Sequence, residues 1–286
     1  MGQTLKKVRS DQTGNLTLTF RRRTIFEELE ERFPDLTELP PELGLIVLSN
    51  LSATDLCLAA CVNQFWASLA NDEMLWNGLC RATWGSVSAY RHRDDSSFSY
   101  RKLYLELDEG TLTFNADPRL GIQYLINKEI LDNTPRAIAH FIHTTNRLDR
   151  RQVRKFVSQR RDVLDELISL HNYANKFLAN ALRQFFSNID APKQRGDELQ
   201  ALIEKFASRF IICNPECGLN EETIYVLCYS LLLLSIDLTS PHVKNKMSKR
   251  EFIRNVRQAT MRVDDELSGH LYDNIYLVGH IAPQKW

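Results

Sequence analysis

Helical periodicity runs through most of this chain and leaves few fold classes open. From Phe114 to about Pro283, apolar residues recur at the three- and four-residue spacing of a single helix face. No run long enough for a strand alternates apolar and polar residues in this region, and no internal repeat is evident. We therefore predict an all-α protein. Helix breaks are expected at Asp117-Pro118, Asn133-Thr134-Pro135, Ala191-Pro192 and Asn214-Pro215.

Length and charge limit the number of domains and the kinds of partner. A chain of 286 residues is long for one helical domain and is sufficient for two domains with separate cores. Its 36 Lys and Arg residues balance its 36 Asp and Glu residues, so no overall field attracts nucleic acid or an anionic membrane. We expect no nucleic-acid partner, and we expect any membrane contact to be indirect or to involve the N-terminal arm.

The cysteines and histidines do not form a recognisable metal-ligand pattern. Cys57 and Cys61 lie four residues apart on one predicted helix, but no histidine pair accompanies them, and this spacing favours core packing. His140 and His143 lack a neighbouring carboxylate motif. We expect neither a metal nor a cofactor. No secretory signal precedes the six cysteines, so we expect reduced thiols and a cytoplasmic location.

A group of short helices is predicted near the start of the chain. Leu39-Pro40-Pro41-Glu42-Leu43 favours a helix start, because proline suits a first turn that has no partner for its missing N–H. Ser52 and Asp55 are spaced as a helix cap and its partner, which predicts a second helix. Phe65, Trp66, Leu69, Leu75, Trp76 and Leu79 supply the bulky apolar residues that follow.

Residues 38–80 resemble the F-box in several fixed offsets. The LPxEL start is followed by a leucine-rich helix, an L-S-x-x-D-L helix, a V-x-x-x-W helix and a closing L-W. The resemblance implies docking onto a Skp-family adaptor of a cullin-based ubiquitin ligase. The alternative is that the same residues only close a three-helix core. The contact residues that it implies are Leu39, Pro40, Glu42, Ile46 and Leu51.

Residues 114–282 resemble the Sec-7 domain. The pattern opens with Phe114-Asn115-x-x-Pro118-x-x-Gly121 and continues in family order to Phe206-Ala207 and Asp237-Leu238. The resemblance implies a right-handed helical stack whose hydrophobic groove receives an ARF-family small GTPase. That partner would bring the protein to membranes only indirectly. The implied GTPase contacts are Ile189, Tyr225, Tyr229, Leu233, Asp237 and Ser240, and the alternative is that the apolar ones are ordinary core.

Gln194 occupies the position at which the Sec-7 family carries its exchange glutamate. In that family the carboxylate is placed beside the nucleotide's β-phosphate and Mg²⁺, and its negative charge repels the phosphate. An uncharged amide between Lys193 and Arg195 would not repel a phosphate. We expect weak or absent nucleotide exchange, although a one-residue shift of the loop could bring Asp197 or Glu198 forward.

Three functions remain open. The first is a substrate-recognition adaptor of an SCF ubiquitin ligase that binds an ARF-family GTPase, without catalysis of its own. The second is an ARF guanine-nucleotide exchange factor that also carries an F-box, and the third is a scaffold that sequesters the GTPase. The predicted domains are an N-terminal arm (1–35), an F-box (36–84), a linker helix (85–110) and a Sec-7-like domain (111–286).

Overall fold

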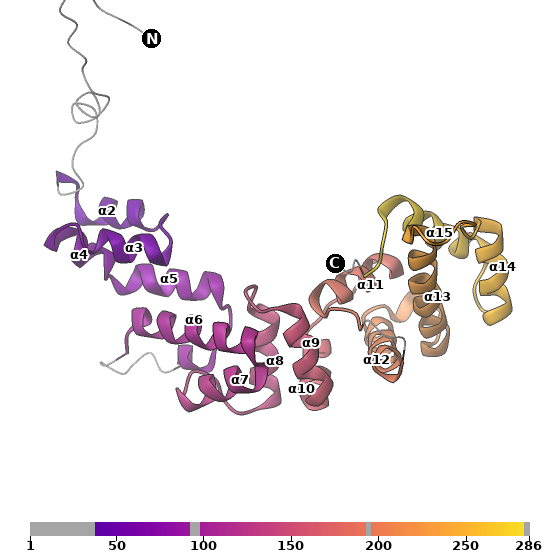
Figure 1. Cartoon of the computed structure of the whole chain (residues 1–286), viewed down its shortest axis with the longest axis horizontal. Helices are drawn as coiled ribbons and strands as arrows, with labels where there is room; N and C mark the ends of the chain where they lie inside the picture. Colours follow the sequence, from indigo (N-terminus) through magenta and orange to yellow (C-terminus); the bar gives the residue numbers. More distant parts are fainter. Residues whose placement is uncertain (1–37, 92–97, 193–195, 283–286) are drawn as a thin grey trace, which may run out of the picture. The chain divides into compact units, whose positions relative to one another are not determined.

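The computed structural model describes residues 38–91, 98–192 and 196–282, and these residues are helical with no strand among them (Figure 1). The prediction of an all-α chain is confirmed. The predicted arm and the exchange position Gln194 lie outside the described residues. The chain divides into two compact units with the boundary between Leu75 and Trp76.

From residue 38, where its described part begins, the first unit contains three short helices: α2 (Pro41–Leu48), α3 (Ala53–Ala59) and α4 (Gln64–Ala70). Pro41 stands at the first position of α2, and Ser52 caps α3 by accepting a hydrogen bond of 3.2 Å from the backbone N–H of Asp55. α2 and α3 both pack against α4. Leu48, Leu56 and Leu69 are buried and form the core of this unit.

The second unit is a series of helices in which neighbours along the chain pack together, for example α6 with α7, α12 with α13 and α14 with α15. The unit boundary falls inside α5 (Glu73–Thr83). The remaining helices are α6 (Tyr100–Ala116), α7 (Pro118–Asn127), α8 (Pro135–Thr144), α9 (Arg150–Gln159), α10 (Arg161–Ser169), α11 (Leu178–Asn188), α12 (Asp197–Cys213), α13 (Glu221–Thr239), α14 (Lys249–Ala259) and α15 (Asp265–Val278).

Local sequence determines where these helices begin. Asp117 caps α7, and its side chain accepts hydrogen bonds from the backbone N–H groups of Arg119 and Leu120. Ser248 and Glu251 form a complete capping box at the start of α14. All four predicted breaks fall between helices. One boundary differs from expectation: α6 continues through Phe114 to Ala116, because nothing interrupts the helix before Asp117-Pro118.

α13 is the most apolar of the long helices, and by length and composition alone it could cross a membrane. The structure instead places one side of it in the core, where Leu227, Cys228 and Leu231 are fully buried. Burial without a nearby positive charge raises the pKa of the Cys228 thiol. These observations favour a core helix for this segment.

Gly121 allows α6 and α7 to approach closely. A Cβ at this position would lie 2.4 Å from the backbone N and Cα of Phe114, so the two helices would have to move apart. We expect Gly121→Ala to lower the free energy of unfolding by about 2 kcal/mol, as overpacking does in other cores. Chemical denaturation checks this. Gly78→Ala is the control, because nothing lies within 4 Å of its Cβ position and alanine favours a helix; equal losses in both variants would contradict the argument.

His171 connects the segment after α10 to α11 and α12. Its Nδ1–H donates to the carbonyl of Leu167 (2.9 Å), and its Nε2 lies 2.9 Å from the amide nitrogen of Asn188. Its own carbonyl accepts a hydrogen bond from Nε of Arg209. Burial, and secondarily the neighbouring His143, lower the pKa of His171 to about 4. The folded state therefore holds a neutral imidazole.

This pKa predicts acid sensitivity. An imidazole in the unfolded chain has a pKa near 6.5, so the stability contributed by neutral His171 is complete above that pH and is lost as the pH falls from 6.5 to 4. We expect the free energy of unfolding to fall by about 2 kcal/mol between pH 7 and pH 5 through this group. Denaturant titrations of the wild type and His171→Gln at both pH values test it. An unchanged pH dependence in the variant would show that other groups are responsible.

Candidate functional site

α2 exposes large aliphatic side chains on a surface that we call the α2 face, formed by Leu43, Ile46 and Val47. Ile46 is 62% exposed and Val47 50%, whereas Leu48 of the same helix is buried. Six of the eight residues of α2 are large and aliphatic or proline, so a short helix of this composition cannot bury all of them on one side. Exposed aliphatic residues gathered on one helix are typical of a protein-docking surface.

The five predicted adaptor contacts lie on or beside α2. Pro40 caps the helix, Glu42 is in its first turn, and Ile46 is near its middle; all three are exposed. Leu39 precedes the helix and Leu51 follows it, and both are half-buried. Leu43 was predicted to lie at the helix start, but neither Leu43 nor Val47 was predicted as a contact. The nearly continuous apolar run from Leu43 to Leu48 is the sequence signal that could have identified them as contacts.

In the second unit, the predicted contacts Tyr225, Tyr229 and Leu233 lie one turn apart along α13 and are half-buried. The two tyrosine rings stack with their centroids 6.4 Å apart and an interplanar angle of 19°. Burial, with a smaller contribution from Glu204 of α12, raises the pKa of Tyr225. Ile236, which sequence analysis missed, continues this row, and we call the four residues the α13 stripe.

Asp237 and Ser240 hold the connection between α13 and α14. The carboxylate of Asp237 accepts a 2.7 Å hydrogen bond from the backbone N–H of Met247, and Nζ of Lys246 donates to the carbonyls of Asp237 and Ser240. The hydroxyl of Tyr272 donates to the Met247 carbonyl at 2.9 Å. The polar groups of both predicted contacts therefore have partners within the fold, and their contact with a GTPase stays a prediction.

Ile189 requires a correction. We expected it in a groove open to a partner, but the structure places it directly after α11 with its side chain fully buried. The chain turns inward here: Pro192 is also buried, and Nη1 of Arg154 donates to the carbonyl of Ala191 at 2.9 Å. Ile189 is a core residue that positions the start of the loop leading to Gln194.

Asp197 and Glu198 form the first turn of α12. They line a pocket of about 310 Å³ together with Arg154 of α9 and Arg161 of α10. Glu204, by contrast, lies near Tyr225 of α13. Asp197 and Glu198, the alternatives to Gln194 after a one-residue loop shift, therefore lie on the part of α12 that adjoins α9 and α10.

Within the described residues, no three His, Cys, Asp or Glu side chains are grouped as metal ligands. Cys57 and Cys61 are both free thiols, and the Sγ–H of Cys61 donates to the Cys57 carbonyl at 3.4 Å. His143 stacks edge-on against His171, at 5.1 Å between ring centroids. These contacts are those of helix packing. The expected lack of a metal and a cofactor stays a prediction.

Comparison with known families assigns each unit a relative. The family model described as F-box-like matches residues 36–82, and the family model described as Sec7 domain matches residues 104–277. The predicted domain limits themselves stay a prediction. F-box only protein 8 of Mus musculus is 57% identical over 257 residues, which cover 88% of this chain and 80% of that protein.

Two solved structures resemble the second unit. The crystal structure of the Sec7p catalytic domain aligns with a TM-score of 0.55 and 30% identity, covering 59% of this chain and 95% of that one. The structure of ARF1-GDP bound to a Sec7 domain complexed with Brefeldin A aligns with a TM-score of 0.57 and 23% identity, covering 62% of this chain and 93% of that chain. The second likeness shows the fold alone.

Proposed function

Because this chain belongs to the family of F-box only protein 8, with an F-box-like region ahead of a Sec7 domain, we propose that it is a substrate-recognition subunit of an SCF ubiquitin ligase. Its F-box docks onto a Skp-family adaptor and through it onto a cullin. Its Sec7 domain holds an ARF-family GTPase for ubiquitylation. This activity takes place in the cytoplasm. It takes place at a membrane only where the GTPase is located at that membrane.

The exposed α2 face is the observation that carries this proposal. A helix that presents Leu43, Ile46 and Val47 to solvent can insert them into an apolar groove of a partner. Each such side chain contributes roughly 1.5 to 3 kcal/mol when it is completely buried.

The α13 stripe supports binding of a GTPase by the second unit. Tyr225 and Tyr229 are large, partly accessible and held rigid by stacking, which are properties of residues that dominate protein interfaces. A Sec7 domain has been solved with ARF1-GDP, so a GTPase of this family is the partner that we propose.

We further propose that the second unit binds the GTPase without catalysing nucleotide exchange. The exchange position holds Gln194, which has no charge with which to repel the nucleotide's phosphate, and it is flanked by Lys193 and Arg195. Asp197 and Glu198 are built into the first turn of α12, which argues against either of them replacing the missing carboxylate.

Nucleotide exchange is the second candidate function. It is favoured by the match to the Sec7p catalytic domain, 30% identical over nearly all of that domain. The two functions differ in a measurable way, because an exchange factor accelerates release of GDP, whereas a recognition subunit presents the bound GTPase to the ligase, which then attaches ubiquitin to it.

One reconstitution separates them. The full chain is combined with a Skp-family adaptor, a cullin–RING ligase, ubiquitin with its activating and conjugating enzymes and ATP, and an ARF-family GTPase loaded with fluorescent GDP. Both ubiquitin conjugates and GDP release are followed. We expect conjugates on the GTPase and GDP release near the spontaneous rate, with Gln194→Glu accelerating release. Rapid GDP release by the unmodified chain without conjugates would establish the exchange factor instead.

A further inference from the structure

α9 carries a local excess of positive charge in a chain whose charges otherwise balance. Arg150, Arg151, Arg154 and Lys155 lie within its ten residues, and no acidic residue does. The structure shows that part of this charge borders a pocket.

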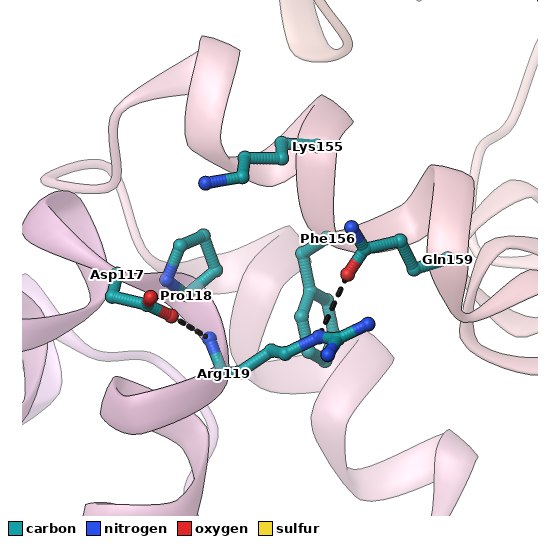
Figure 2. A pocket seen from close by; sticks show the side chains of 6 residues that line it. All are labelled: Asp117, Pro118, Arg119, Lys155, Phe156 and Gln159. Atoms are coloured by element: carbon teal, nitrogen blue, oxygen red, sulfur yellow. Dashed lines mark hydrogen bonds between the residues drawn. The ribbon is translucent and has the colours of Figure 1, made fainter.

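Figure 2 shows this pocket, which lies between the start of α7 and α9. Its volume is about 190 Å³, and it is lined by Asp117, Pro118, Arg119, Lys155, Phe156 and Gln159. Lys155 extends over Pro118 from α9, while Arg119 extends from α7 on the opposite side towards Gln159. A second pocket of about 330 Å³ shares Arg119, Phe156 and Gln159 and adds the amides of Gln123 and Asn133.

The two cations are available to a ligand. Nε of Arg119 donates to Oε1 of Gln159 at 2.8 Å, which orients the guanidinium and leaves its two NH₂ groups for another acceptor. In the described part of the chain, neither Arg119 nor Lys155 makes an ion pair with a carboxylate. By contrast, Arg160, which borders the second pocket, is already paired with Asp162.

Asp117 also lines the pocket and would repel an anion. Its Oδ1 accepts the backbone N–H groups of Arg119 (2.9 Å) and Leu120 (3.3 Å), so its charge is partly offset by the positive end of α7. Two cations therefore face one carboxylate that is engaged in capping. The other cations of α9 add to the positive potential around the opening.

We propose that this pocket binds a phosphate monoester group. A guanidinium matches two phosphate oxygens with its paired N–H groups, and a lysine on the opposite side can neutralise the remaining charge. A planar carboxylate would be satisfied by the arginine alone. The neighbouring pocket, with its amides, could accept the hydroxyl groups of a polyol that carries the phosphate. This proposal does not depend on the α2 face or on the proposed GTPase partner.

The phosphate could come from a lipid headgroup or from a soluble phosphate ester. The test uses the full chain with three probes: phosphatidylcholine vesicles containing a phosphatidylinositol monophosphate, vesicles brought to the same charge with phosphatidylserine, and a soluble inositol bisphosphate. The site variant is Arg119→Gln with Lys155→Gln. The matched control is Arg250→Gln with Arg254→Gln, which removes the same charge from exposed positions of α14.

We expect the site variant to bind the phosphate probe at least tenfold more weakly, because it loses two charge-assisted hydrogen-bonding groups, and the control to bind normally. Binding of the soluble probe would identify a free phosphate ester as sufficient; binding only to phosphoinositide vesicles would identify a lipid headgroup. Equal binding to both kinds of vesicle, equal losses in the two variants, or no binding to any probe would overturn the proposal.

Discussion

Replacing Ile46 with aspartate is expected to abolish capture of a Skp-family adaptor by the full chain. Ile46 is 62% exposed, so the substitution removes little core packing from the first unit. At an interface it would both lose an apolar contact and bury an unpaired charge, costs of about 2 kcal/mol and several kcal/mol respectively. We expect affinity to fall about a thousandfold or more, measured by surface-immobilised adaptor or pull-down.

The control for this experiment is Leu277→Asp. Leu277 is 79% exposed on α15, so the same change of charge is made at an equally accessible aliphatic residue in the other unit. Circular dichroism of both variants checks that the helices remain. Normal adaptor binding by Ile46→Asp would show that the α2 face is not the docking surface. The predicted contacts Pro40 and Leu51, where alanine is expected to weaken adaptor binding most, are tested by a double alanine variant.

The double variant Tyr225→Ala with Tyr229→Ala is expected to lose binding of an ARF-family GTPase. Truncation of a central interface tyrosine commonly costs about 2 kcal/mol or more, so two of them cost about 4 kcal/mol, or close to a thousandfold in affinity. Titration calorimetry with the full chain measures this. Both side chains are only half-buried, so much of the ring surface is available to a partner.

Two comparisons isolate this effect from a loss of folding. Tyr225→Phe with Tyr229→Phe keeps the stacked rings and should bind within a few-fold of the wild type, since the proposed contact is chiefly apolar. Tyr276→Ala breaks a similar stack in α15, where the Tyr272 and Tyr276 rings lie 6.3 Å apart at 12°. Equal losses of GTPase binding in the α13 and α15 variants would refute a specific role for the α13 stripe.

The fold could be predicted because its signals are local. A helix start depends on a cap and on residues within one turn of it, as at Ser52 with Asp55 and at Asp117-Pro118, and these are adjacent in the sequence. The row formed by Tyr225, Tyr229 and Leu233 was also visible, because residues four apart share a helix face. Family patterns then gave the order of the two domains, which the comparisons confirm.

Burial at the candidate sites could not be predicted in this way. Ile189 has the same side chain as Ile46, yet one is completely buried and the other is largely exposed. The difference depends on which distant elements pack over each residue. For the loop after α11, one of these is α9, whose Arg154 binds the Ala191 carbonyl across 37 positions of sequence.

By itself, the sequence of this protein determined the helices, their order, the two family resemblances and the lack of a glutamate at position 194, because each depends on residue identity or short spacing. Only the tertiary structure decided that Ile189 is core, that Asp237 and Ser240 hold a connection, and that Arg119 and Lys155 face one pocket. These last facts depend on how separate helices pack. Packing brings together residues that are far apart in the sequence, and nothing in their spacing indicates that they will be in contact.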